Sequence, residues 1–166
     1  MKGRQKIMGM EKIIKKFIDN DCQVCYANAF TYFPDVPLIT YTCEEPTECN
    51  REWKEFLKKE FNFNLTKDNL FAMSILHELG HHYTIKLFSD EEWEEEATEK
   101  KLEDVPEEEY LQAYFRLPIE YAASKWAVEI YNLNEKIMRN WNYRFYCALR
   151  HYEKKHKVKN SLLTKL

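Results

Sequence analysis

The sequence predicts an α+β fold that is predominantly helical, with a small N-terminal sheet packed on one of the helices. Glycine and proline are rare, with 3 and 5 among 166 residues, which favours a helix-rich globular chain. β-branched and aromatic residues gather near the N-terminus, at 22–33 and 36–42, as they do in strands. Over much of the remaining chain, apolar residues recur at helical spacing. We expect one domain, residues 1–166, because a chain of this length can bury its own core.

The expected elements divide this domain into three parts. Residues 1–65 would form a helix, the small sheet and a second helix. Residues 66–132 would form the helices of the candidate site, and residues 133–166 a last helix with a basic tail. The expected ranges are a helix at 8–19, strands within 22–33 and at 36–42, a loop at 43–50, and helices at 51–61, 66–88, 118–132 and 135–157. Thr66 is the expected N-cap of its helix, Ser89 or Asp90 caps the next segment, and Pro118 opens another helix.

Charge and cysteine content narrow the class of protein. The formal net charge is −3, which favours neither nucleic acid nor an acidic substrate as a partner. No apolar run reaches the length of a membrane span, and the N-terminus lacks the apolar core of a secretory signal. The odd number of cysteines, 5, fits a compartment where thiols stay reduced. We therefore expect a soluble cytoplasmic protein without a membrane partner.

The cysteines allow two interpretations. Cys22-x-x-Cys25 could form half of a zinc site, with Cys43 and Cys49 as the other half. The second pair has five intervening residues, where structural zinc pairs usually have two to four. The favoured interpretation is that Cys22 and Cys25 lie in or beside a strand as small hydrophobic residues.

Two charged segments are also open to two interpretations. Residues 90–109 hold twelve acidic residues against Lys100 and Lys101. A solvated helix and loop is favoured there over an acidic surface that binds a partner. The helix at 135–157 is basic on one side, and an ordinary wet face is favoured over a surface for nucleic acid or lipid.

The motif that carries chemistry is at residues 76–83, LHELGHHY. Positions i and i+4 of a helix share one face, so His77 and His81 can bind the same zinc ion. Glu78 is about 100° of helix rotation from His77. In an HExxH site the two histidines hold the metal and the glutamate acts as general base. Gly80 costs about 1 kcal/mol in a helix relative to alanine, which suggests that another segment approaches closely there.

The surroundings of the motif favour a metal site over a chance pattern. Apolar residues flank it on the same helix, at Leu70, Phe71, Ile75, Leu76 and Leu79. Two histidines and a glutamate in a buried helix are costly without partners, and a metal ion would be such a partner. His82 projects from another face, where a hydrogen-bonded or exposed histidine is expected.

A catalytic zinc ion needs a third protein ligand. Glu120 is the favoured candidate, since it lies in the first turn of an apolar helix whose small Ala123 would permit close packing. Trp126 and Ala127 continue the same face. The other candidates are less well placed: His151 and His156 in the basic C-terminal helix, and Glu94, Glu95 and Glu96 in the acidic segment.

The pattern His77-Glu78-Leu79-Gly80-His81, followed by Glu120-x-x-Ala123-x-x-Trp126-Ala127, resembles the ImmA/IrrE family of zinc metallopeptidases, within the glutamate zincins. The resemblance covers roughly residues 66 to 132. It implies a minimal zincin-like fold, zinc bound by His77, His81 and Glu120, and Glu78 as the general base. It further implies a bacterial, phage or mobile-element origin, and some members of the family cleave a repressor protein. The sequence differs from the family in the acidic insertion between His81 and Glu120.

Three functions remain open at this point. The first is a zinc peptidase whose protein or peptide substrate pairs with the edge of the small sheet, which we expect at residues 36–42. A tyrosine or histidine would help to stabilise the oxyanion, but the eleven tyrosines leave the choice open. The second is a zincin fold used as a binding or regulatory module. The third is a helical interaction module in which the HExxH pattern arose by chance.

Overall fold

The computed structural model describes residues 15, 22–27, 29–41, 47–97 and 102–156. It confirms a mixed α+β fold that is mainly helical, with one small sheet. The helix expected at 8–19 lies outside the described residues, apart from Lys15. Among the described helices, none combines the length and apolar character that crossing a membrane requires.

The sheet has three strands in the order β1-β3-β2. β2 (Thr31–Phe33) and β3 (Leu38–Tyr41) are antiparallel, whereas β1 (Gln23–Tyr26) pairs with β3 in parallel. The segment 22–33 therefore supplies two strands rather than one. The prediction that residues 36–42 form an edge was wrong, because β3 has a neighbour on each side. Its side chains fit this central place, since Ile39 and Tyr41 are completely buried.

Helix α2 (Thr47–Phe61) begins four residues earlier than predicted. The expected loop at 43–50 is thus wrong for residues 47–50, and residues 43–46 lie outside the described part of the chain. Polar residues are compatible with a first helical turn, so their polarity did not mark a loop. Trp53, Phe56 and Leu57 form the buried face of α2, at the spacing of an amphipathic helix.

Helix α3 (Leu70–Thr84) carries the motif and continues into a short 3-10 turn, η1 (Ile85–Leu87). Thr66 organises the approach to α3 but is not its N-cap. Its Oγ1 accepts a hydrogen bond from Asp68 N at 3.2 Å, and its own N–H donates to Asn69 Oδ1 at 2.8 Å. This reciprocal pair resembles a capping box and closes the turn at 67–69, so α3 begins after that turn.

Of the remaining helices, those expected at 118–132 and 135–157 are confirmed to within one residue at either end, whereas the short helix at 110–114 was not predicted. Ser89 caps α4 (Asp90–Ala97) through a reciprocal pair with Glu92, at 2.8 and 3.1 Å. A short α5 (Tyr110–Tyr114) follows the acidic segment. Pro118 opens α6 (Pro118–Leu133), and α7 (Glu135–His156) ends the described chain.

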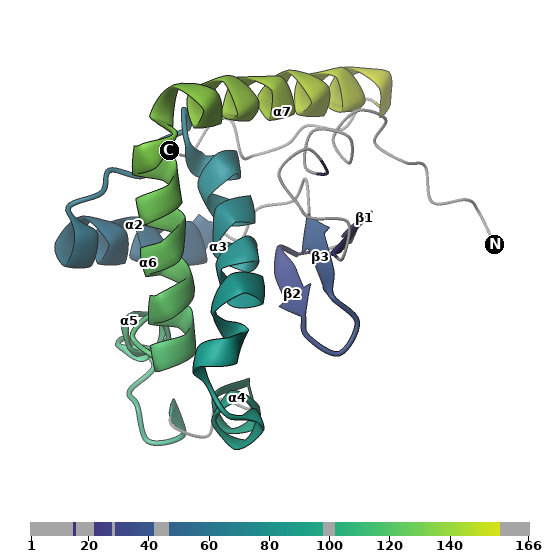
Figure 1. The fold of residues 1–166 in the computed structure, drawn as a ribbon. Coiled ribbons are helices and arrows are strands. Elements are labelled where there is room, and N and C mark those ends of the chain that lie inside the picture. The colour runs from purple at the N-terminus through teal and green to yellow at the C-terminus, as the bar shows by residue number, and fades with distance from the viewer. Residues whose placement is uncertain (1–14, 16–21, 28, 42–46, 98–101, 157–166) are drawn as a thin grey trace.

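The helices α3 and α6 run side by side at the centre of the molecule, with the sheet on the other side of α3 (Figure 1). β2 and β3 both contact α3, as the sequence predicted. α7 crosses the upper ends of α3 and α6 in this view. Its Asn142 accepts a hydrogen bond from Ala72 N at 3.1 Å and donates to the Lys67 carbonyl at 3.0 Å, so α7 caps the start of α3. The motif helix α3 therefore packs against α6, the sheet and α7.

Candidate metal centre

The site depends on a close approach between α3 and α6. At Gly80, an added Cβ atom would lie 2.5 Å from the carbonyl oxygen of Ala123 and 2.8 Å from its Cα. Only a residue without a side chain allows this backbone contact. The predicted reason for Gly80 is confirmed, and Ala123 is the residue that approaches it. The contact brings the first turn of α6 beside the motif.

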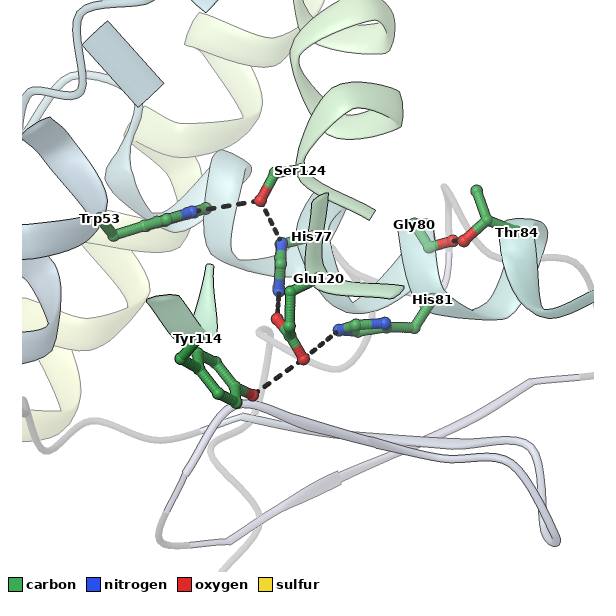
Figure 2. A network of polar contacts seen from close by, with 8 residues as sticks. All are labelled: Trp53, His77, Gly80, His81, Thr84, Tyr114, Glu120 and Ser124. Carbon is green, nitrogen blue, oxygen red and sulfur yellow. Dashed lines mark hydrogen bonds and ion pairs between the residues drawn. The ribbon is translucent and has the colours of Figure 1, made fainter. Parts of the chain in front are cut away.

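Three predicted ligands meet at this approach. His77 Nε2 lies 3.0 Å from Glu120 Oε2, and His81 Nε2 lies 3.4 Å from Glu120 Oε1. Figure 2 shows the carboxylate of Glu120 lying between the two imidazole rings. The side chains are 11%, 8% and 12% exposed for His77, His81 and Glu120. One donor atom from each residue lies within 4.8 Å of the others, so this buried group could hold a metal ion.

The electrostatics of the group fit a bound cation. Burial would raise the pKa of Glu120, but the adjacent His81 and His77 outweigh this and hold its pKa well below the usual range. Burial would likewise lower the pKa of His81, but the Glu120 carboxylate outweighs that and raises it. The ionised carboxylate thus draws positive charge into a buried space, and a metal cation would supply that charge.

The two imidazoles differ in the hydrogen-bond partner of Nδ1, the ring nitrogen that faces away from Glu120. His77 Nδ1 lies 3.1 Å from Ser124 Oγ, and Trp53 Nε1 donates to the same oxygen at 3.4 Å. His81 Nδ1 is buried and has no hydrogen-bond partner among the residues that the structure describes. No motif in the sequence singled out Ser124 or Trp53. The spacing of Glu120 and Ser124 on one helix face was the available signal.

Glu78 lies beside the ligands without joining them. It is 8% exposed, and its carboxylate accepts a hydrogen bond from the backbone N–H of Tyr32 in β2. Burial raises its pKa above the ordinary value of 4.5, although His77 and His81 act against this rise. The position predicted for a general base is therefore occupied by a buried carboxylate that touches the edge strand.

A cleft of about 220 Å³ opens over the three ligands and Glu78. Apart from the ligands and Glu78, its walls are mainly aromatic and aliphatic, and they come from the segment around β2, from α4 and α5, and from the start of α6. The lining residues that matter here are Tyr32, Trp93, Tyr114, Leu117 and Ile119.

Tyr114 is a site residue that the sequence did not single out. Its hydroxyl donates a hydrogen bond to Glu120 Oε1 at 2.8 Å and lines the cleft. Figure 2 shows its ring approaching the carboxylate from the side opposite to Ser124. It precedes Glu120 by only six residues. The turn between them was not predicted, so Tyr114 could not be distinguished from the other tyrosines of the eleven in the chain.

The structure also places several of the other candidates. His82 faces away from the ligand group and pairs through Nδ1 with the Tyr32 hydroxyl at 3.0 Å, which confirms the expected hydrogen-bonded histidine. Cys22 is buried just before β1, and Cys25 is half-buried within it. The side chains of the remaining candidates lie outside the described part of the structure: Cys43, Cys49, Glu94, Glu95, Glu96, His151 and His156.

In comparisons with known proteins, no family model matches the chain, and neither the curated proteins nor the solved structures give a match.

Proposed function

We propose that this protein is a zinc-dependent peptidase that hydrolyses a peptide bond in a protein substrate. The observation that carries the proposal is the buried group of His77, His81 and Glu120, with Glu78 facing the same cleft. The resemblance to the ImmA/IrrE metallopeptidases supports it, since the four matching residues lie together in space. A cytoplasmic regulator or repressor of a phage or mobile element is the substrate class that this resemblance suggests.

The donor set favours zinc over other metals. Two imidazoles and one carboxylate are a ligand set of catalytic zinc sites, which leave a further position open for water or substrate. Ca²⁺ and Mg²⁺ prefer oxygen ligands and rarely choose imidazole. The cleft lies over the ligands and gives that open position access from outside.

Each residue of the site has a role in the proposed reaction. Zinc, when bound, would lower the pKa of water and polarise a carbonyl group. Glu78 would accept the proton of the attacking water and pass it to the leaving amine. The raised pKa of Glu78 suits this task, because a base works best with a pKa near the working pH. Tyr114 is the candidate to donate a hydrogen bond to the oxyanion, since its hydroxyl already reaches the ligand carboxylate.

The substrate would bind along β2 rather than β3. β2 is an edge strand, and Thr31 and Tyr32 line the cleft above the ligands. An extended peptide can add to such an edge through main-chain hydrogen bonds. The Tyr32 N–H donates to Glu78, so the strand edge and the proposed base are already joined.

The test is cleavage of a diverse library of unstructured peptides by the zinc-loaded protein, with Glu78→Gln as the matched variant. This variant keeps the size of the side chain and all three ligands. The proposal expects cleavage by the wild type and a loss of at least about 100-fold in the variant, the lower end of what a general base contributes. Equal cleavage by the zinc-loaded wild type and the zinc-loaded Glu78→Gln variant would contradict the proposal and favour a binding or regulatory module.

A further inference from the structure

Helix α6 contacts His77 at both ring nitrogens. Glu120 and Ser124 are four residues apart, so they lie one above the other on the same face of α6. Glu120 Oε2 lies 3.0 Å from Nε2, and Ser124 Oγ lies 3.1 Å from Nδ1 (Figure 2). Contacts from one helix therefore fix the tilt of the ring and the direction in which its Nε2 points.

Ser124 is itself held in place from a third helix. It is completely buried, and the indole N–H of Trp53 in α2 donates to its Oγ. The Trp53 ring also packs edge to face on the His77 ring, with centroids 5.5 Å apart. Contacts from α2 and α6 thus converge on His77, and nothing in the sequence motif provides them.

A hydroxyl is the group that suits Nδ1 in both states of the site. Without metal, Nε2 faces a carboxylate and is the donor, so Nδ1 accepts the hydrogen bond of the Ser124 hydroxyl. With metal, Nε2 needs its lone pair, and Nδ1–H becomes the donor to the same oxygen. A serine can change from donor to acceptor, whereas a carboxylate or a carbonyl group can only accept.

We propose that Ser124, oriented by Trp53, is a positioning residue that holds the His77 ring in the orientation that binds metal and accepts its Nδ1–H once metal occupies Nε2. The proposal rests on the metal site of the proposed function. It distinguishes the two histidines, because His81 Nδ1 has no comparable partner among the described residues. The ring orientation of His77 is thus fixed before zinc binds, and the affinity for zinc depends on that orientation.

The test is the zinc affinity of the full chain, measured by competition with a chromogenic chelator. Ser124→Ala is expected to weaken zinc binding by about 10–100-fold, the usual cost of removing a residue that supports a metal ligand. Trp53→Phe keeps an aromatic ring against His77 but removes the N–H, and is expected to weaken binding to a smaller extent. Ser74→Ala is the matched control, since Ser74 lies on α3 and its hydroxyl donates to the Leu70 carbonyl of the same helix. Its affinity should equal that of the wild type.

A nuclear magnetic resonance measurement separates positioning from a general structural role. The indole N–H proton of Trp53 and the Nδ1–H proton of zinc-loaded His77 are the probes. Ser124→Ala should shift the first and expose the second to exchange, while Ser74→Ala leaves both unchanged. If Ser124→Ala does not fold, Trp53→Phe still carries the second readout, the exchange of the His77 Nδ1–H proton, which should become faster than in the wild type.

The outcomes distinguish this proposal from the proposed function. Zinc binding by the wild type with unchanged affinity in Ser124→Ala and Trp53→Phe would overturn the positioning role alone. No zinc binding by the wild type would overturn both the zinc site and the positioning role. Weaker zinc binding in Ser124→Ala and Trp53→Phe, with Ser74→Ala unchanged, would establish the positioning role of Ser124.

Discussion

Gly80 on α3 lies directly against the backbone of Ala123 on α6, where the two helices of the site pack together. A Cβ atom at position 80 would lie 2.5 Å from the Ala123 carbonyl oxygen, much nearer than real Cβ contacts come. The contact occurs one turn away from both His77 and Glu120, so the spacing of the ligands depends on it. The glycine in the motif is therefore a requirement of packing.

Gly80→Ala should push α6 away from α3 and separate the ligands. Overpacking costs about 1–3 kcal/mol, and the higher helix propensity of alanine offsets up to about 1 kcal/mol of this. We expect a net loss of stability in chemical denaturation together with weaker zinc binding. Because the clash is with backbone atoms, adding Ala123→Gly should not rescue the variant. A double variant restored to wild-type stability would contradict the account.

The stability of the metal-free protein should fall as the pH rises above about 6.5. The pKa of His81 is raised above its ordinary value of 6.5, so its pairing with Glu120 stabilises the fold fully below that pH. This contribution is lost as the pH rises through the folded pKa. The raised pKa of Glu78 acts in the same direction, from about pH 4.5 upwards.

Zinc should reverse this pH dependence, because metal binding requires unprotonated imidazoles. Denaturation midpoints of chelator-treated and zinc-loaded protein between pH 5.5 and 8.5, values chosen to bracket about 6.5, would check both statements. His81→Ala serves as the control and should lose the decline that belongs to His81. A metal-free protein that becomes more stable over this range would show that His81 and Glu120 are not paired as described.

Tyr114→Phe should weaken the site without removing it. The hydroxyl donates to the ligand carboxylate at 2.8 Å, and supporting hydrogen bonds of this kind are worth about 10-fold or more in metal affinity. If Tyr114 also assists the oxyanion, peptide cleavage at saturating zinc should fall as well. Tyr143→Phe, at an exposed position on α7, is the matched control. Equal zinc affinity in both variants would leave Tyr114 without a role at the metal.

The candidate site could be predicted largely because its signals are local. The spacing that brings His77 and His81 together is a property of any helix. Gly80 and Ala123 are small, and their size predicted a close approach between their two helices. Glu120 stood out as an acidic residue on an apolar face. Each of these inferences needed only the geometry of one helix.

The parts that failed depend on contacts between distant segments. β1 pairs with β3 across the hairpin, and this long-range pairing placed residues 36–42 in the middle of the sheet. Asn142 caps α3 from a helix 70 positions further along the chain. Trp53 reaches the site by the same kind of packing, from a position 71 residues before Ser124. No local pattern in the sequence reports such contacts.

The measurement that tests the central claim most directly is the metal content of the protein, purified without chelator and without a metal-affinity tag, beside Glu120→Ala. The account predicts one zinc ion per chain in the wild type and a clear reduction in the variant, which lacks the carboxylate between His77 and His81. No zinc in either protein, even after zinc is added back, would contradict it. The buried histidines and glutamate would then be a polar network of the core rather than a metal centre.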